Sequence, residues 1–138
     1  MRVVADTHTV VSELLWYGPP RQVLDAARTG MMPLSTSTSL LAELAEVLQR
    51  PTLVQPLAQA NVTPHLLVFG YAALARLVVP APIGPVVVAD PDDEAVLACA
   101  VAAQAEVMVS GDRALLALEA YEGMPIITAA PLMARIAS

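Results

Sequence analysis

Four acidic residues stand in short motifs whose residue types could build a metal site: Asp6, Glu43, Asp93 and Asp112. Three of them follow apolar runs or open a helix-like segment, and Glu43 lies within an amphipathic one. In an open α/β sheet, ligands bind beyond the carboxyl ends of the strands, so carboxylates from separate segments could meet there. Two such charges about 4 Å apart repel by roughly 4 kcal/mol at an effective dielectric near 20. Such a cluster therefore needs a cation, and hard carboxylate oxygens suit Mg²⁺ or Mn²⁺.

Each acid also has a purely structural interpretation. Asp6, Asp93 and Asp112 each stand where a carboxylate could cap the N-terminus of a helix. Glu43 lies on the flank of the apolar stripe of a predicted helix, and a surface glutamate there is usually only a solubilising group. Asp93 falls near the centre of such a stripe, where an unpaired carboxylate is costly, whereas Asp92 lies to one side and is the natural N-cap of that helix. Each acid is ambiguous alone, but the set of four favours a metal site.

Length and composition limit the class of protein. The chain has 138 residues, of which 57% are hydrophobic, and we expect one domain spanning residues 1–138. No apolar run approaches the ~20 residues of a membrane-spanning helix, so we expect no membrane association. Residues 1–6 lack the apolar core of a signal peptide, and Cys99 is the only cysteine. We therefore expect a cytoplasmic protein.

The charge balance excludes several activities. Thirteen acidic residues face seven basic ones, and all seven are arginine. Without lysine the chain cannot form a P-loop or a Schiff-base site. A sequence pI near 4.6 also argues against a broad basic surface for nucleic acid. A nucleic-acid substrate would have to be held by the metal and a few arginines, and Arg113 and Arg21 are the first candidates for phosphate contacts.

Strand-like and helix-like segments alternate along the chain. Strands are predicted at residues 2–5, 32–35, 86–88, 106–109 and 125–127. Helices are predicted at residues 8–16, 21–29, 37–50, 64–77, 93–104, 113–118 and 130–136, with a broken helix at 52–62. This order predicts an α/β fold with a central, mainly parallel twisted sheet of about four to five strands flanked by helices on both faces.

In order and spacing, the four acidic motifs resemble those of the PIN-domain family, and within it the toxin components of toxin–antitoxin pairs, the VapC-like ribonucleases. The segments that carry the resemblance are residues 6–12, 41–51, 90–100 and 109–116. Together they span nearly the whole chain. One position departs from the family pattern, because His8 stands where the family usually has asparagine.

The resemblance implies a function for each motif. Asp6, Glu43, Asp93 and Asp112 would be the catalytic acids that hold Mg²⁺ or Mn²⁺. The side chains expected to support them are Thr7, His8 and Ser110. The implied activity is hydrolysis of phosphodiester bonds in RNA, and the implied partners are an antitoxin protein that blocks the site and a second copy of the chain in a homodimer.

Two other functions are to be compared with this one. A catalytically weak or inactive PIN-like module that binds RNA or protein is the main alternative, supported by His8 and by the weak basic character. A phosphatase of the haloacid type is excluded, because the segment from Asp6 to His8 lacks the second aspartate that its nucleophile motif requires.

Overall fold

The computed structural model describes residues 1–16, 18–84 and 91–137. These residues contain a six-stranded sheet with the order β3-β2-β1-β4-β6-β5. The strands are β1 Val3–Ala5, β2 Leu34–Thr36, β3 Arg76–Leu77, β4 Val107–Val109, β5 Ala120–Tyr121 and β6 Met124–Ile127. Neighbouring strands are parallel except for the antiparallel pair of β5 and β6. The predicted α/β fold with a mainly parallel sheet is confirmed.

The strand order reverses at β1. The chain first builds outward through β2 and β3, and later returns to place β4 on the other side of β1. Val3 therefore pairs with Leu34 on one side and with Val107 on the other. In doubly wound sheets a crevice opens at such a reversal, outside the carboxyl ends of the strands. The residues that follow β1 and β4 meet at this point.

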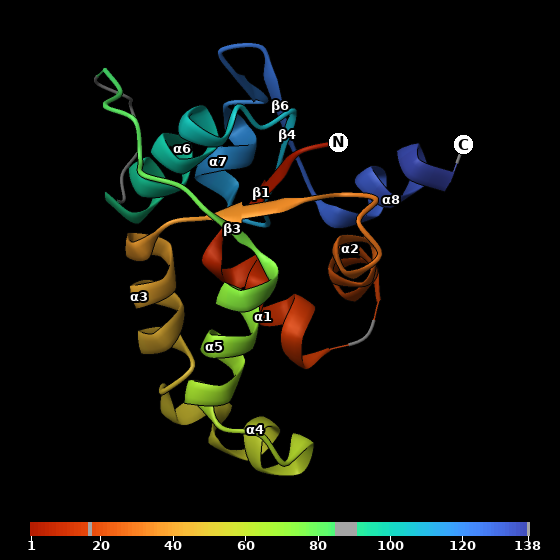
Figure 1. The fold of residues 1–138 in the computed structure, drawn as a ribbon, viewed down its shortest axis with the longest axis vertical. Helices are drawn as coiled ribbons and strands as arrows, with labels where there is room; N and C mark the ends of the chain where they lie inside the picture. The colour runs from red at the N-terminus through yellow and green to blue at the C-terminus, as the bar shows by residue number, and fades with distance from the viewer. Residues whose placement is uncertain (17, 85–90, 138) are drawn as a thin grey trace.

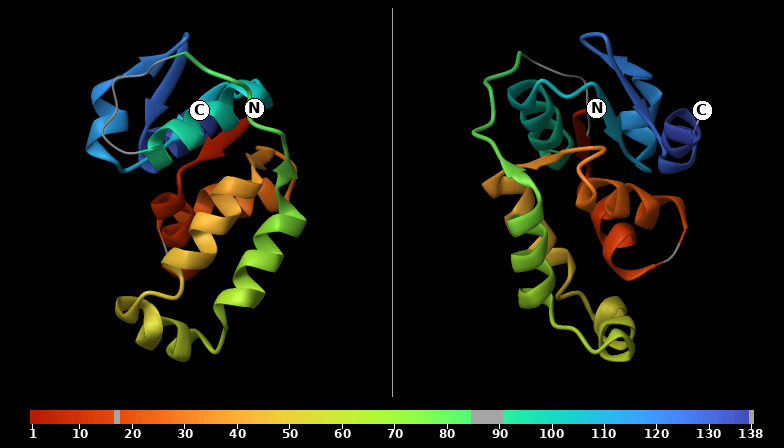
Figure 2. Two further views of the ribbon diagram at one scale, coloured as in Figure 1. Left: turned by 90° about the vertical axis from the view of Figure 1, so that its left-hand side faces the viewer. Right: turned by 45° about the vertical axis from the view of Figure 1, so that its right-hand side comes forward.

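Helices cover both faces of the sheet, as Figures 1 and 2 show. They are α1 Thr7–Leu15, α2 Pro19–Arg28, α3 Thr38–Val47, α4 Val54–Ala60, α5 Pro64–Leu74, α6 Pro91–Ala103, α7 Arg113–Ala117 and α8 Ala129–Ala137, with a 3-10 turn at Pro51–Leu53. Side chains of β1 alternate between two cores: Val4 packs with α6 and α7, whereas Val3 and Ala5 pack with the other layer. A parallel sheet buried on both faces explains the continuous apolar runs of its strands.

The structure differs from the predicted elements at the edges of the sheet. The helix predicted to reach residue 77 ends at Leu74, and Arg76–Leu77 instead form strand β3 beside β2. The N–H of Val78 donates to the carbonyl of Thr36 over 2.9 Å, a pairing that outweighs local helix propensity. Strand β5 was also missed, which gives six strands rather than four to five. The strand predicted at residues 86–88 lies outside the described residues.

Other boundaries shift by a few residues. The helix predicted at residues 37–50 ends at Val47, and the strand predicted at 32–35 lies at Leu34–Thr36. Helix α6 begins at Pro91, so Asp92 lies within its first turn and is not the N-cap that the sequence favoured.

One acidic residue lies inside the core. Glu13 of α1 has an exposed fraction of 0%, and neither of its carboxyl oxygens has a hydrogen-bond partner among the described residues. The hydroxyl of Tyr71 on α5 is likewise buried and unpaired within that part of the chain. Burial, followed by the charge of Asp6, raises the pKa of Glu13 from 4.5 to about 8. Glu13 is therefore protonated in the folded protein at neutral pH.

Candidate active site

The four predicted acids line one small cavity at the reversal point of the sheet. Asp6 follows β1, Asp112 follows β4, Glu43 comes from α3 and Asp93 from the first turn of α6. The cavity has a volume of about 90 Å³. The described residues that line it are Asp6, Thr7, His8, Leu40, Glu43, Arg50, Asp92, Asp93, Val96 and Asp112. The chain thus brings together acids that are far apart in the sequence, as the strand order requires.

Ser110 connects the acids that follow β1 and β4. Its hydroxyl donates to Oδ2 of Asp6 over 2.5 Å and accepts the backbone N–H of Asp112 over 3.0 Å. Ser110 is only 1% exposed, so these bonds are shielded from water. The side chain that the resemblance assigned a supporting role therefore fixes the relative positions of two acids.

Asp6 and Asp112 each cap a helix and also line the acidic cavity. Asp6 caps α1 by accepting the N–H of Thr9 over 3.0 Å, and Asp112 caps α7 by accepting the N–H of Ala114 over 2.7 Å. A carboxylate has about four lone-pair sites, so a cap leaves acceptor capacity for a further ligand. Capping holds both groups in fixed orientations at the cavity.

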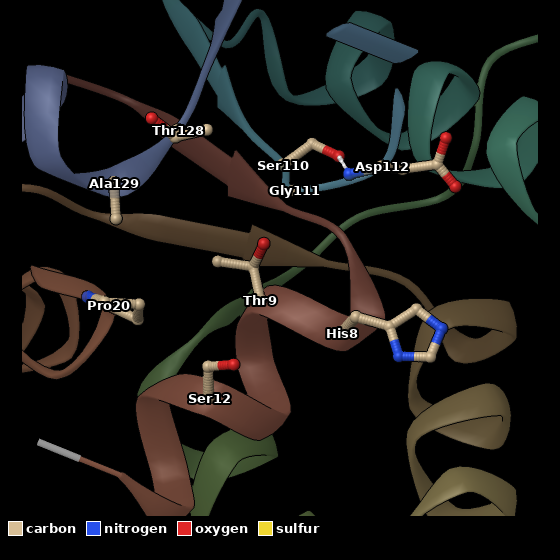
Figure 3. A pocket seen from close by; sticks show the side chains of 9 residues that line it. All are labelled: His8, Thr9, Ser12, Pro20, Ser110, Gly111, Asp112, Thr128 and Ala129. Atoms are coloured by element: carbon tan, nitrogen blue, oxygen red, sulfur yellow. Dashed lines mark hydrogen bonds between the residues drawn. The ribbon is translucent and has the colours of Figure 1, made fainter. Parts of the chain in front are cut away.

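Glu43 lies in the most crowded acidic part of the cavity. Burial raises the pKa of its carboxyl, and the nearby charge of Asp92 raises it further. The hydroxyl of Thr7 and the His8 side chain act in the opposite direction and lower this pKa. Figure 3 shows the His8 ring extending from the start of α1 toward α3, the helix that carries Glu43. Thr7 and His8 thus partly stabilise the charged form of Glu43.

The donor set fits a hard divalent cation. Carboxylate oxygens dominate the lining, and Asp6 and Asp93 are buried, with exposed fractions of 6% and 7%. The Thr7 hydroxyl in the same lining is buried and has no hydrogen-bond partner at bonding distance among the described residues. No group of three His, Cys, Asp or Glu side chains among those residues already has the spacing of a metal cluster.

Two lining residues were missed by the sequence analysis. Asp92 was interpreted as a cap, yet it lies in the cavity beside Glu43. Arg50 also lines the cavity; it lies beyond the end of α3 in extended backbone, so helical spacing from Glu43 could not have identified it.

Of the arginines proposed from the sequence, neither belongs to this lining as described. Arg113 is exposed at the start of α7. Arg21 lies elsewhere, donating to the carbonyl of Leu14 over 3.3 Å and lying 3.9 Å from a carboxylate oxygen of Asp25.

Removal of the Ser110 hydroxyl should loosen the site. In Ser110→Ala, the buried carboxylate of Asp6 loses a donor and the half-buried N–H of Asp112 loses its acceptor, which should lower the unfolding free energy by about 1–3 kcal/mol. Ser110→Thr keeps the hydroxyl and should retain most of that stability. Urea denaturation of the three proteins measures the difference. Equal stability of Ser110→Ala and the unmodified protein would contradict the role of this hydroxyl.

Comparison with known proteins agrees with this site. A family model described as the PIN domain matches residues 2–114, which include all four candidate acids: Asp6, Glu43, Asp93 and Asp112. Searches among curated proteins and among solved structures gave no significant match. Over the described residues, none of the helices combines the length and the hydropathy needed to cross a bilayer. PIN domains are generally nucleases and typically use divalent metal ions. Because the match covers well over half of the chain, this protein belongs to the PIN-domain family.

Proposed function

We propose that this protein is a Mg²⁺- or Mn²⁺-dependent endoribonuclease that hydrolyses RNA phosphodiester bonds at the acidic cavity. The observation that carries the proposal is the convergence of Asp6, Glu43, Asp93 and Asp112 on one cavity at the reversal point of a parallel sheet. Asp92 adds a fifth carboxylate to the same lining. Membership of a nuclease family supports the same reaction.

The residues of the cavity would have different roles in the reaction. A bound Mg²⁺ or Mn²⁺ would supply an activated water and neutralise charge on the phosphate. Asp6 and Asp112 are held in place by helix N-termini and by Ser110, so their orientation is fixed before substrate arrives. Glu43 and Asp93, in the same lining, would add further carboxylate ligands to the ion.

Substrate binding has to overcome the charge of the protein. The formal net charge is −6, so RNA is repelled at long range and needs a local attraction. Arg50 at the edge of the cavity is the basic side chain best placed to contact a phosphate beside the acids. Together with a bound cation it would hold the scissile phosphate next to the carboxylates. Arg113, next to Asp112 in the sequence, is the second candidate.

Cleavage of RNA should depend on acids inside the cavity and not on acids beside it. Glu43→Gln and Asp93→Asn should each lower the rate by at least about 100-fold, because both remove a charged metal ligand. Glu46 on α3 and Glu94 on α6 are exposed and outside the lining, so Glu46→Gln and Glu94→Gln are matched controls. The measurement is the cleavage rate of a labelled single-stranded RNA with Mn²⁺ and with EDTA.

The same assay separates the proposed enzyme from its main alternative. Binding of the RNA without any Mn²⁺-dependent cleavage by the unmodified protein would identify a catalytically inactive binding module. His8 in place of the family's asparagine is the observation that favours this alternative. Equal cleavage by Asp93→Asn and Glu94→Gln would place the chemistry outside the acidic cavity.

We further propose a cytoplasmic toxin of a toxin–antitoxin pair that forms a homodimer. The family resemblance supports the toxin role, and the exposed side chains of Leu66 and Phe69 on α5 offer an apolar helix face for a second copy. Expression of the unmodified protein without its antitoxin should arrest growth, whereas Asp93→Asn should not. Unimpaired growth with the unmodified protein at equal abundance would contradict the toxin role.

A further inference from the structure

A second cavity adjoins the acidic one at the carboxyl ends of β1, β4 and β6, and Figure 3 shows it from close by. It has a volume of about 290 Å³. Its walls come from the first two turns of α1, the first turns of α2 and α8, and the turn that follows β4. Pockets that bind small organic molecules begin at about 300 Å³, so this space suits one compact molecule.

The lining of this cavity consists mainly of hydroxyl and small apolar groups. Thr9 and Ser12 lie three residues apart on α1 and therefore share one helix face, and Thr128 stands across from them before α8. Pro20 and Ala129 supply apolar contact. Among the side chains drawn in Figure 3, the hydroxyls of Thr9, Ser12 and Thr128 make no hydrogen bond with one another or with the rest of the lining. They are available to donate to and accept from a ligand.

The two cavities are neighbours that share part of their lining. His8 and Asp112 line both of them, and Ser110 of the second cavity holds Asp6 of the first. A molecule in the second cavity would therefore lie directly beside the place where the acids act. Asp112 supplies the only carboxylate among the described residues of this lining, and none of those residues is an arginine.

We propose that the second cavity binds the nucleoside next to the scissile phosphate, with the base and ribose inserted among the hydroxyls of Thr9, Ser12 and Thr128. This inference rests on the proposed function and specifies its substrate class. A neutral heterocycle with polar edges matches a lining of hydroxyls and small apolar groups, whereas a phosphate would meet Asp112 without a cation to offset it. A base can enter only if it is unpaired, so the substrate is single-stranded at this nucleotide.

The test uses free nucleosides, which carry no phosphate and need no metal. Uridine and adenosine are titrated into the metal-free protein while amide signals are followed by ¹H–¹⁵N NMR. One of the two nucleosides or both should shift the signals of Gly111, Thr128 and Ala129 at millimolar concentration. Inorganic phosphate at the same concentration should leave these signals in place.

Variants then assign the binding to the cavity. Ser12→Leu fills it and should weaken nucleoside binding by at least about tenfold, equivalent to about 1.4 kcal/mol. Thr128 is exposed, so Thr128→Leu narrows the cavity from the other side with little risk to folding. Thr52, exposed in the 3-10 turn and outside this lining, provides the control variant Thr52→Leu.

Three results would overturn the inference. They are unchanged signals of Gly111, Thr128 and Ala129 with both nucleosides, equal shifts with inorganic phosphate, and equal nucleoside binding by Thr128→Leu and Thr52→Leu. Because this readout requires neither metal nor cleavage, its failure is distinct from failure of the nuclease assay. RNA cleavage without nucleoside binding would contradict only the proposed nucleoside site. Nucleoside binding without cleavage would contradict only the proposed nuclease activity.

Discussion

Glu13→Gln should stabilise the folded protein by roughly 3 kcal/mol at pH 7. Folding raises the pKa of Glu13 from 4.5 to about 8, so between these values the unfolded chain releases a proton that the folded protein keeps. The unfolding free energy is therefore highest below the pKa that Glu13 has in the unfolded chain. As the pH rises above that value, the unfolding free energy falls by about 1.4 kcal/mol per pH unit, and it levels off above the pKa that Glu13 has in the folded protein. Glutamine keeps the shape and cannot ionise, so the variant escapes this loss.

Denaturation in urea at several pH values without divalent metal measures the effect. The difference in unfolding free energy between Glu13→Gln and the unmodified protein should be small near pH 4, grow through neutrality and be largest above about pH 8. Glu46→Gln changes an exposed glutamate and should show no such growth. A difference that stays constant from acid to alkaline pH would mean that Glu13 is not held neutral in the core.

Millimolar Mn²⁺ should raise the melting temperature of the unmodified protein by about 5–10 °C. A ligand that binds only the folded state stabilises it by about 2.7 kcal/mol at a concentration 100 times its Kd, and for a domain of this size each kcal/mol shifts the melting temperature by a few degrees. Asp6→Asn and Asp93→Asn should lose most of this shift, because each removes one of the buried carboxylates of the acidic cavity.

The control for this measurement is again a neighbouring acid. Glu94→Gln removes a charge from the same turn of α6 as Asp93 but lies outside the cavity, so it should retain the full shift. A shift of equal size in the unmodified protein, Asp93→Asn and Glu94→Gln would show that Mn²⁺ binds elsewhere. The cavity would then need another explanation for its crowded carboxylates.

The sequence predicted the central elements of the fold well and its edges poorly. Strands β1 and β4 are apolar runs buried on both faces, so local composition already identifies them. Strands β3 and β5 have two residues each and exist because a neighbour offers unpaired backbone groups. Glu122 and Gly123, both with positive φ, form the turn between β5 and β6, and no strong local pattern marks the short strand before it.

The sequence predicted those site residues that stand within a recognisable local motif. Asp6 and Asp112 follow strands, and the order of parallel strands places them together. Arg50 and Asp92 reach the cavity only because α3 and α6 pack side by side, which no local pattern reveals. Glu13 was missed for a related reason. Both α2 and α3 pack against α1, and the buried residues of α1 include Glu13 and two threonines beside its valines, so burial is not confined to its apolar positions.

The hydrogen bond between Ser110 and Asp6 joins residues 104 positions apart, and this separation has a consequence for biosynthesis. The ribosome releases β1 early, but β1 cannot acquire its neighbour β4 until most of the chain has emerged. Pairings between such distant segments are slow, because loop closure has to precede any gain from contact. A nascent chain therefore carries Asp6 without Asp112, and the acidic cavity cannot form until the segment from Val107 to Asp112 has also left the ribosome.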